Sequence, residues 1–381
     1  MIKGLQFGVF DHIEPIPGQD LGQVYSDRLS QIERFDSDGF YAYHLAEHHT
    51  PAVHSLAPSQ NVFLAAASQR TDRIRLNPCI YVLPLHHPLR LIEEICMLDH
   101  LSDGRLEVGV GRGGVLEAYF WGSDWDVEQN LAKYTETLEV VRAGLSSDSL
   151  THAGEFYQFD ELPMRLRPKQ APYPPMWYMR NVETAAQHGM NSIIVGNLSG
   201  FEANVRRYRE LWEVYQGPGA KTAQGEDPKI GLVSHLVLAD TEEEAAAAAE
   251  PAWEQYLWNL FTPRRLEAER RGLSEVWGGG EVRPSGLPDR DAGEKYLTNN
   301  SSDSSNVQQR PEPGQVVEHS GSAAFRVIAG TPDTVRSYLD EYVATGANYF
   351  VCGFHFGNMD SAVAERSIDL FIKEVMPHYL D

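Results

Sequence analysis

Short apolar runs alternate along the chain with longer segments in which apolar residues recur every three or four positions. The short runs predict β-strands, and the longer segments predict amphipathic helices. Strands that alternate with helices eight times are typical of an α/β fold of the (β/α)8 TIM barrel type, and 381 residues are enough for one such domain over residues 1–381. The predicted strands cover residues 5–10, 40–46, 74–83, 105–110, 176–179, 192–195, 230–238 and 348–354.

The stretch from Ile74 to Gly114 shows this repeat most clearly. An apolar run over residues 74–83 is followed by a helical pattern, and Ser102-Asp103-Gly104 then ends the helix. A second short strand, residues 105–110, leads directly into the glycine-rich loop of residues 109–114. The pattern predicts a parallel βαβ unit that ends in a loop suited to binding an anion.

Residues 277–322 interrupt the repeat before the last strand. They contain three successive glycines and the polar run TNNSSDSSNVQQRPEPG. A connection of this length and composition is either a mobile lid over one end of the barrel or a locally disordered insertion without a role.

Composition narrows the classes of partner. The formal net charge of −22 disfavours nucleic acid and anionic membranes, because both bind through positive charge. Cys79, Cys96 and Cys352 lie far apart in apolar runs, which favours free thiols in a reducing compartment. The first residues do not form a signal peptide, and no apolar run approaches the length of a membrane span. We therefore expect a soluble, cytoplasmic protein.

The sequence Ala46-Glu47-His48-His49 follows the second predicted strand. In a parallel barrel the C-terminal ends of the strands carry the active site. A histidine there can transfer protons near neutral pH, and a neighbouring carboxylate can orient it or bind a ligand ring. The alternative is that both histidines serve packing or an interface.

Several histidines raise the question of a metal site. The set comprises His12, His44, His48, His49, His86 and His87. However, no His-x-His follows the first strand and no acidic residue ends the eighth, and these are the places where metal-dependent barrel hydrolases resemble one another. The sequence therefore predicts no metal.

The loop Gly109 to Gly114 matches the spacing G-x-G-x-x-G of dinucleotide-binding folds. The match follows the fourth strand, and no acidic residue stands at the distance that a ribose contact needs. We favour another use of the same loop, in which glycines allow close approach to a ligand and Arg112 binds a phosphate. The alternative is an arginine exposed in a tight turn.

Longer strings carry a specific resemblance. They are AEHH (46–49), VLPLHHPLRLIEEICMLDHLSDGRLEVGVGRG (82–113), GTPDTV (330–335) and RSIDLFIKEVMPHY (366–379). In this order they resemble the bacterial luciferase-like monooxygenase family. The resemblance implies a barrel that takes reduced FMN from a separate flavin reductase, and that reacts with O2 to form a C4a-peroxyflavin, which oxidises a small organic substrate.

The resemblance also implies residue roles. His48 matches the catalytic histidine beside the flavin, and Glu47 matches the acidic neighbour that contacts the isoalloxazine. Arg112 matches the arginine that holds the FMN phosphate. Cys79 and Ile80 fall in the backbone segment under the flavin ring, where the family often has a non-proline cis peptide, which we place between these two residues.

Three departures concern flavin binding. Gly111 stands where luciferase has its reactive cysteine, which many non-luminous relatives also lack. Gln129 stands where luciferase has a second phosphate-contacting arginine, so Lys133 or Arg180 would have to replace it. The segment of residues 179–184, after the fifth strand, is several residues shorter than the family's loop on the phosphate side. Asn181 is still expected to cap the helix that follows, whose N-terminus favours an anion.

Two other functions fit the same fold. One is an oxidoreductase that uses the deazaflavin F420 as a hydride carrier, and the other is a non-catalytic flavin-binding subunit of a heterodimer. The presence of Glu47, His48 and Arg112 argues against the second. Family members often pair through the helices after strands two and three, so we expect a homodimer. The substrate is expected to be small and apolar.

Overall fold

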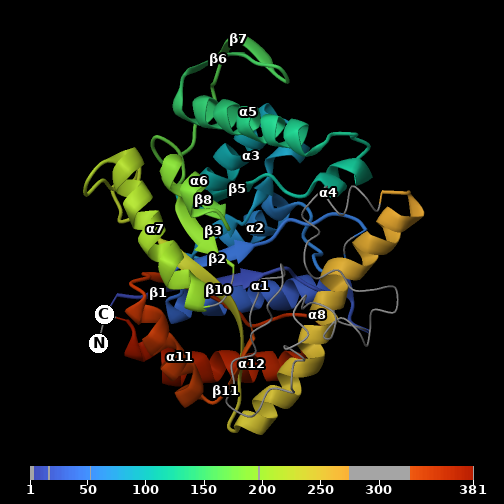
Figure 1. The fold of residues 1–381 in the computed structure, drawn as a ribbon, viewed down its shortest axis with the longest axis vertical. Coiled ribbons are helices and arrows are strands. Elements are labelled where there is room, and N and C mark those ends of the chain that lie inside the picture. Colours follow the sequence, from blue (N-terminus) through green and yellow to red (C-terminus); the bar gives the residue numbers. More distant parts are fainter. Residues whose placement is uncertain (1–3, 16–17, 52, 196–197, 274–326, 381) are drawn as a thin grey trace.

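The computed structural model describes residues 4–15, 18–51, 53–195, 198–273 and 327–380. Its centre is a ten-stranded parallel sheet (Figure 1). The strands are β1 (Gln6–Asp11), β2 (Ala42–Leu45), β3 (Arg75–Pro78), β4 (Tyr81–Val82), β5 (Val108–Gly111), β8 (Met176–Met179), β9 (Asn191–Ile194), β10 (Ile230–Leu238), β11 (Val327–Gly330) and β12 (Tyr349–Gly353). They lie in the order β3–β2–β1–β12–β10–β9–β8–β5–β4, with β11 beside β10.

The sheet closes into a barrel. β4 follows β3 in the chain, and a parallel bridge joins Leu76 of β3 to Leu106, just before β5. The two ends of the sheet therefore meet, which removes free strand edges. The fold is a TIM-barrel-like parallel barrel, and the eight predicted strands are confirmed.

Helices surround the strands (Figure 1). They are α1 (Leu21–Asp38), α2 (Gln60–Ser68), α3 (Pro88–Leu101), α4 (Val115–Phe120), α5 (Val127–Ser146), α6 (Val182–Gln187), α7 (Leu198–Gln216), α8 (Glu242–Arg270), α11 (Pro332–Ala344) and α12 (Ser361–Leu370). The ends of α1 show how sequence sets their bounds: the Asp20 side chain accepts a hydrogen bond from the backbone of Gln23, and Gly39 ends the helix at φ 86°. None of the described helices has the length and apolar character that crossing a membrane requires.

The predicted strand over residues 74–83 is interrupted. β3 ends at Pro78, the Cys79–Ile80 peptide is cis as predicted, and β4 then resumes for two residues. A short 3-10 turn over residues 83–85 follows, with Pro84 near its start. The apolar run could not reveal this break. Every residue from Leu76 to Cys79 is buried, so burial does not distinguish the strand from the point where it ends.

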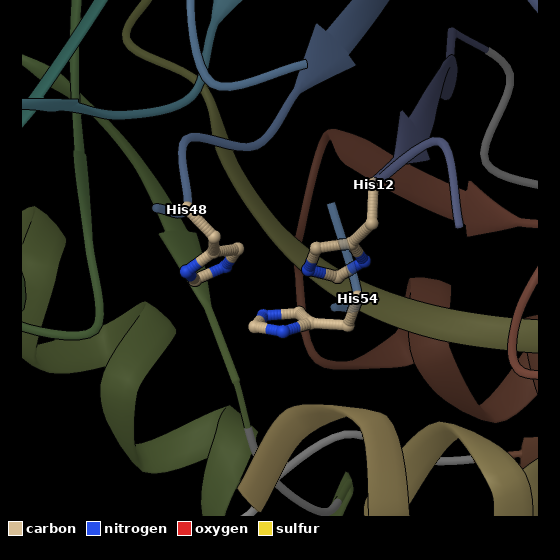
Figure 2. Close-up of side chains that lie close together, drawn as sticks. All are labelled: His12, His48 and His54. Carbon is tan, nitrogen blue, oxygen red and sulfur yellow. The ribbon is translucent and has the colours of Figure 1, made fainter. Parts of the chain in front are cut away.

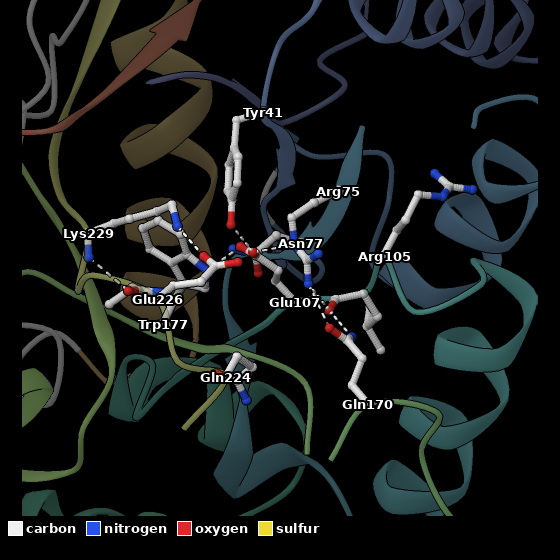
Figure 3. A network of polar contacts seen from close by, with 12 residues as sticks. Tyr41, Arg75, Asn77, Arg105, Glu107, Gln170, Trp177, Gln224, Glu226 and Lys229 are labelled. Carbon is white, nitrogen blue, oxygen red and sulfur yellow. Dashed lines mark hydrogen bonds and ion pairs between the residues drawn. The ribbon is translucent and has the colours of Figure 1, made fainter. Parts of the chain in front are cut away.

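The N-terminal end of the barrel is closed by a polar network around Glu107 (Figure 3). The side chain of Glu107 is fully buried and accepts hydrogen bonds from the Tyr41 hydroxyl at 2.6 Å, from Arg75 Nε at 2.5 Å and from Trp177 Nε1. Lys229 lies over the Tyr41 ring at 4.6 Å. Charged groups at this end of a parallel barrel serve stability, so the candidate site lies at the other end.

Other elements lie outside the predicted strands. β6 (Ser149–Ala153) and β7 (Gln158–Pro163) pair as an antiparallel hairpin. β11 was missed, and it lies beside β10 rather than among the eight strands of the predicted repeat. α8 continues through Pro251 and Pro263 for 29 residues. The predicted insertion at 277–322 lies outside the described residues.

Candidate active site at the C-terminal end of the barrel

Most predicted site residues follow the C-terminal ends of strands. His48 follows β2, the Cys79–Ile80 peptide follows β3, Arg112 follows β5 and Arg180 follows β8. Because these strands are parallel, the structure brings all of these positions to one end of the barrel.

A cluster of three histidines lies at this end (Figure 2). His12 follows β1, and His48 and His54 come from the loop after β2. The ring centroids of His48 and His54 are 3.9 Å apart, and the His12 ring lies 5.4 Å from the first and 5.2 Å from the second. Burial lowers the pKa of all three rings, which therefore remain neutral at pH 7. His54 was not identified from the sequence.

Arg264 of α8 fixes the tautomer of His48. Its Nη2 donates hydrogen bonds to His48 Nδ1 and to Glu117 Oε1, both at 2.7 Å. A neutral imidazole that accepts at Nδ1 carries its proton on Nε2. Burial opposes ionisation of Glu117, but Arg264 and His48 outweigh it and lower the pKa of Glu117 to about 2. Neither Arg264 nor Glu117 was identified from the sequence.

Glu47 does not pair with His48. Its buried carboxylate binds His49 Nε2 at 2.8 Å and His86 Nε2 at 3.0 Å, and it accepts a 3.4 Å hydrogen bond from the backbone of Val82. Burial would lower the pKa of His86, but Glu47 outweighs this effect and raises it. Glu47 therefore connects the loop after β2 to the segment that follows the cis peptide. The carboxylate next to His48 is Glu117.

Ile80 and Gly111 lie against each other. A Cβ atom added at Gly111 would stand 2.0 Å from Ile80 Cδ1, so a cysteine there would require the Ile80 side chain to move. The nearby Cys79 is no substitute for a reactive thiol, because burial raises its pKa and keeps it protonated. Within the described chain, all three cysteines are buried and free, as predicted.

Two arginines offer positive charge at the mouth of the barrel. Arg112 is half-buried, and no acidic group among the described residues forms an ion pair with its guanidinium. Arg180 has a φ of 74° and an exposed side chain, and desolvation by the surrounding protein lowers its pKa. Asn181 caps α6 as predicted, since it accepts a 2.9 Å hydrogen bond from the backbone of Thr184.

Gln129, which stands in place of the missing arginine, and Lys133, one of its two predicted substitutes, are both engaged elsewhere. Gln129 forms a capping box with Asp126 at the start of α5. Lys133 lies 3.8 Å from the centre of the Trp125 ring. Of the two predicted substitutes, Arg180 is therefore the better placed to contact an anion.

Not all of the histidines considered for a metal site lie together. His44, His49 and His86 have other partners: His44 binds the Tyr349 hydroxyl at 2.5 Å, and the other two bind Glu47. In the described parts of the chain, the histidines that could bind one metal ion together are His12, His48 and His54. Their candidate nitrogen atoms lie within 4.8 Å of one another.

Glu14, in the loop after β1, attaches α8 to this end of the barrel. Asn259 Nδ2 of α8 donates to its Oε2 at 2.6 Å, and the backbone of Gly357 donates to its Oε1 at 2.8 Å. Burial raises the pKa of Glu14 from 4.5 to about 7 in spite of these hydrogen bonds. Its ionisation is therefore coupled to folding.

We expect Glu14→Gln to change how stability depends on pH. Because the folded-state pKa of Glu14 exceeds the unfolded value of 4.5, wild-type stability falls as pH rises from 4.5 through about 7, by about 3 kcal/mol. Urea unfolding from pH 4.5 to 8 should show the variant gaining stability relative to wild type by that amount. Glu93→Gln, at an exposed position, is the control, and its stability should depend on pH as that of wild type does. The same pH dependence in Glu14→Gln and wild type would contradict the raised pKa of Glu14.

Comparison with known proteins assigns the chain to a family. The model of the luciferase-like monooxygenase family matches residues 5–349. An uncharacterised protein of Sinorhizobium fredii is 34% identical over 361 residues, which cover 93% of this chain and 92% of that protein. The oxygenase component of the flavin-dependent trigonelline monooxygenase of Acinetobacter baylyi is 29% identical over 254 residues, which cover 64% and 68% of the two chains.

Solved structures share the fold. The oxygenating constituent of 3,6-diketocamphane monooxygenase from Pseudomonas putida, in complex with FMN, superposes with a TM-score of 0.67 at 18% identity and covers 99% of both chains. An F420-dependent secondary alcohol dehydrogenase gives the same TM-score at 17% identity and covers 100% of both chains. On the family match and the extent of the relatives, this chain belongs to the luciferase-like monooxygenase family.

Proposed function

We propose that the protein is the oxygenase component of a two-component flavin monooxygenase. It would take reduced FMN from a separate reductase and use O2 to oxidise a small organic substrate. The observation that carries this proposal is His48, a neutral histidine at the C-terminal end of the barrel whose tautomer Arg264 fixes. The name of the trigonelline relative supports a division into oxygenase and reductase.

The described residues fit FMN. Arg112 suits the phosphate, because its guanidinium forms no ion pair with an acidic group among the described residues. Arg180 offers a second cation at the same end of the barrel. The Cys79–Ile80 segment and Gly111 would lie under the ring, where a side chain at position 111 would displace Ile80. Bound in its reduced form, FMN would supply the electrons that activate O2.

His48 would serve as the acid/base residue. Burial and the charge of Arg264 both disfavour its protonated form, while Glu117 favours it. The proton on Nε2 can be donated and recovered without a change at Nδ1, which Arg264 holds. Glu47 would act differently, by positioning the loop beside Val82 through its contacts with His49 and His86.

F420 is the alternative cofactor, because an F420-dependent dehydrogenase shares the fold. Anaerobic titration with reduced FMN and with reduced F420 distinguishes the two. We expect reduced FMN to bind more tightly, and O2 consumption to require it. Tighter binding of reduced F420, with turnover that needs no O2, would overturn the proposal, as would failure of both cofactors to bind.

We expect Arg112→Ala to weaken FMN binding by about 10- to 100-fold, because a hydrogen bond to a charged group contributes about 1.5–3 kcal/mol. Calorimetric titration with FMN and with riboflavin tests this directly. Riboflavin lacks the phosphate, so its affinity should change less than about threefold, which is the order of a surface effect. Arg90→Ala, at an exposed position on α3, is the matched control. Equal losses for FMN and riboflavin would contradict the phosphate role.

A further inference from the structure

We propose that His12, His48 and His54 form a binding site for a divalent transition metal of the Zn²⁺ class in the flavin-free protein. Three imidazoles with a fourth position left open are an established Zn²⁺ ligand set. Figure 2 shows the three rings gathered around a common space, with one nitrogen of each turned toward it. Metal binding at this site would not require flavin, although it would use His48, the proposed acid/base residue.

The distances between the candidate nitrogen atoms suit a site that contracts slightly when the ion binds. The candidate nitrogen atoms lie within 4.8 Å of one another. Nitrogen atoms bound tetrahedrally to Zn²⁺ at about 2.05 Å are roughly 3.4 Å apart. The nitrogen atoms would therefore have to approach one another by at most about 1.4 Å.

His54 supplies the second, independent observation. Its side chain is fully buried, and neither ring nitrogen has a well-formed hydrogen bond, although the backbone of Asn259 lies close enough to act on its pKa. A buried polar group without a partner is unfavourable, because it loses its hydrogen bonds to water and gains none. A metal ion bound to one of these nitrogens would remove that penalty. Because burial keeps all three rings neutral, no proton has to be lost first.

Glu117 would support the site without binding the metal ion itself. Histidines that bind a metal through one nitrogen usually donate the other N–H to a carboxylate. His48 Nδ1 lies 3.6 Å from Glu117 Oε1, and Arg264 now occupies Nδ1 as a donor. On metal binding through Nε2, the His48 proton moves to Nδ1 and is donated to Glu117. Arg264 remains paired with Glu117 at 2.7 Å, so this pair adds no net charge to oppose the ion.

One consequence is competition with the proposed acid/base role. Nε2 of His48 cannot bind a metal and transfer a proton at the same time. Occupancy by Zn²⁺ would therefore hold the enzyme inactive until a chelator removes the ion.

The test is metal binding to the untagged, flavin-free protein. We expect calorimetry to show one Zn²⁺ per chain, and Co²⁺ at the same site to give the visible absorption bands of a low-coordinate ion. His54→Ala should weaken Zn²⁺ binding at least 100-fold. The matched control is His355→Ala, which removes another buried histidine with an unpaired nitrogen outside the cluster and should leave binding unchanged. Circular dichroism confirms that each variant is folded.

Glu117→Gln separates this site from simple surface binding. It keeps all three ligands but cannot accept the His48 proton as a carboxylate does, and it should weaken Zn²⁺ binding by about 10- to 100-fold. Absence of stoichiometric Zn²⁺ binding, or equal affinity in wild type and His54→Ala, would overturn the proposal. Neither result depends on whether the protein binds FMN, so the metal site and the flavin function succeed or fail separately.

Discussion

Replacing His48 with alanine is expected to lower the rate of substrate oxygenation by about 10²- to 10⁴-fold, the usual contribution of a general acid or base. The ring is held for proton transfer, because Arg264 donates to Nδ1 and leaves the proton on Nε2. The measurement is product formed per reduced FMN consumed, together with the dissociation constant of reduced FMN. That constant should change only a few-fold, because a neutral His48 does not attract the phosphate electrostatically.

The control is His87→Ala, which removes an exposed histidine at the start of α3. It should retain wild-type oxygenation. A loss of only a few-fold in His48→Ala would contradict the acid/base role. A large loss accompanied by an equal loss of flavin affinity would show that His48 serves binding instead.

Removing one partner of the Arg264–Glu117 pair is expected to destabilise the protein by about 3–5 kcal/mol, because the remaining charge is buried without compensation. The side chains are only 11% and 9% exposed. Glu117→Leu would leave the guanidinium beside three neutral histidines. Urea unfolding, extrapolated linearly to water, measures the loss.

The double variant Glu117→Leu/Arg264→Met is the internal control. It removes both charges and replaces them with apolar side chains, so its stability should return to within about 1–2 kcal/mol of wild type. Additive losses in the double variant would mean that each side chain contributes by packing rather than by pairing.

The barrel could be predicted from sequence because its signals are local. Each strand is a short apolar run, and each intervening helix repeats apolar residues at helical spacing, so order and type of element follow from neighbouring residues. The positions of His48 and Arg112 at one barrel end then followed from the direction of parallel strands alone. The cis peptide at Cys79–Ile80 was placed by family resemblance and is confirmed.

The partners of His48 could not be predicted, because they depend on contacts between distant segments. Arg264 is 216 residues from His48 in the chain, and it reaches the site only because α8 continues through two prolines that ordinarily end a helix. Glu117 lies in a segment that gave no helical signal. Glu47 was the obvious carboxylate by adjacency, but successive residues point in different directions, and its side chain turns to His86 instead.

The network around Glu107 has a consequence for kinetics. Because this network closes the N-terminal end of the barrel, the proposed flavin and substrate would enter and leave through the same opening. A molecule bound deeper cannot depart while another lies above it. We therefore expect compulsory-order binding, with flavin first and substrate second, so that excess substrate analogue slows the release of flavin rather than competing with its arrival.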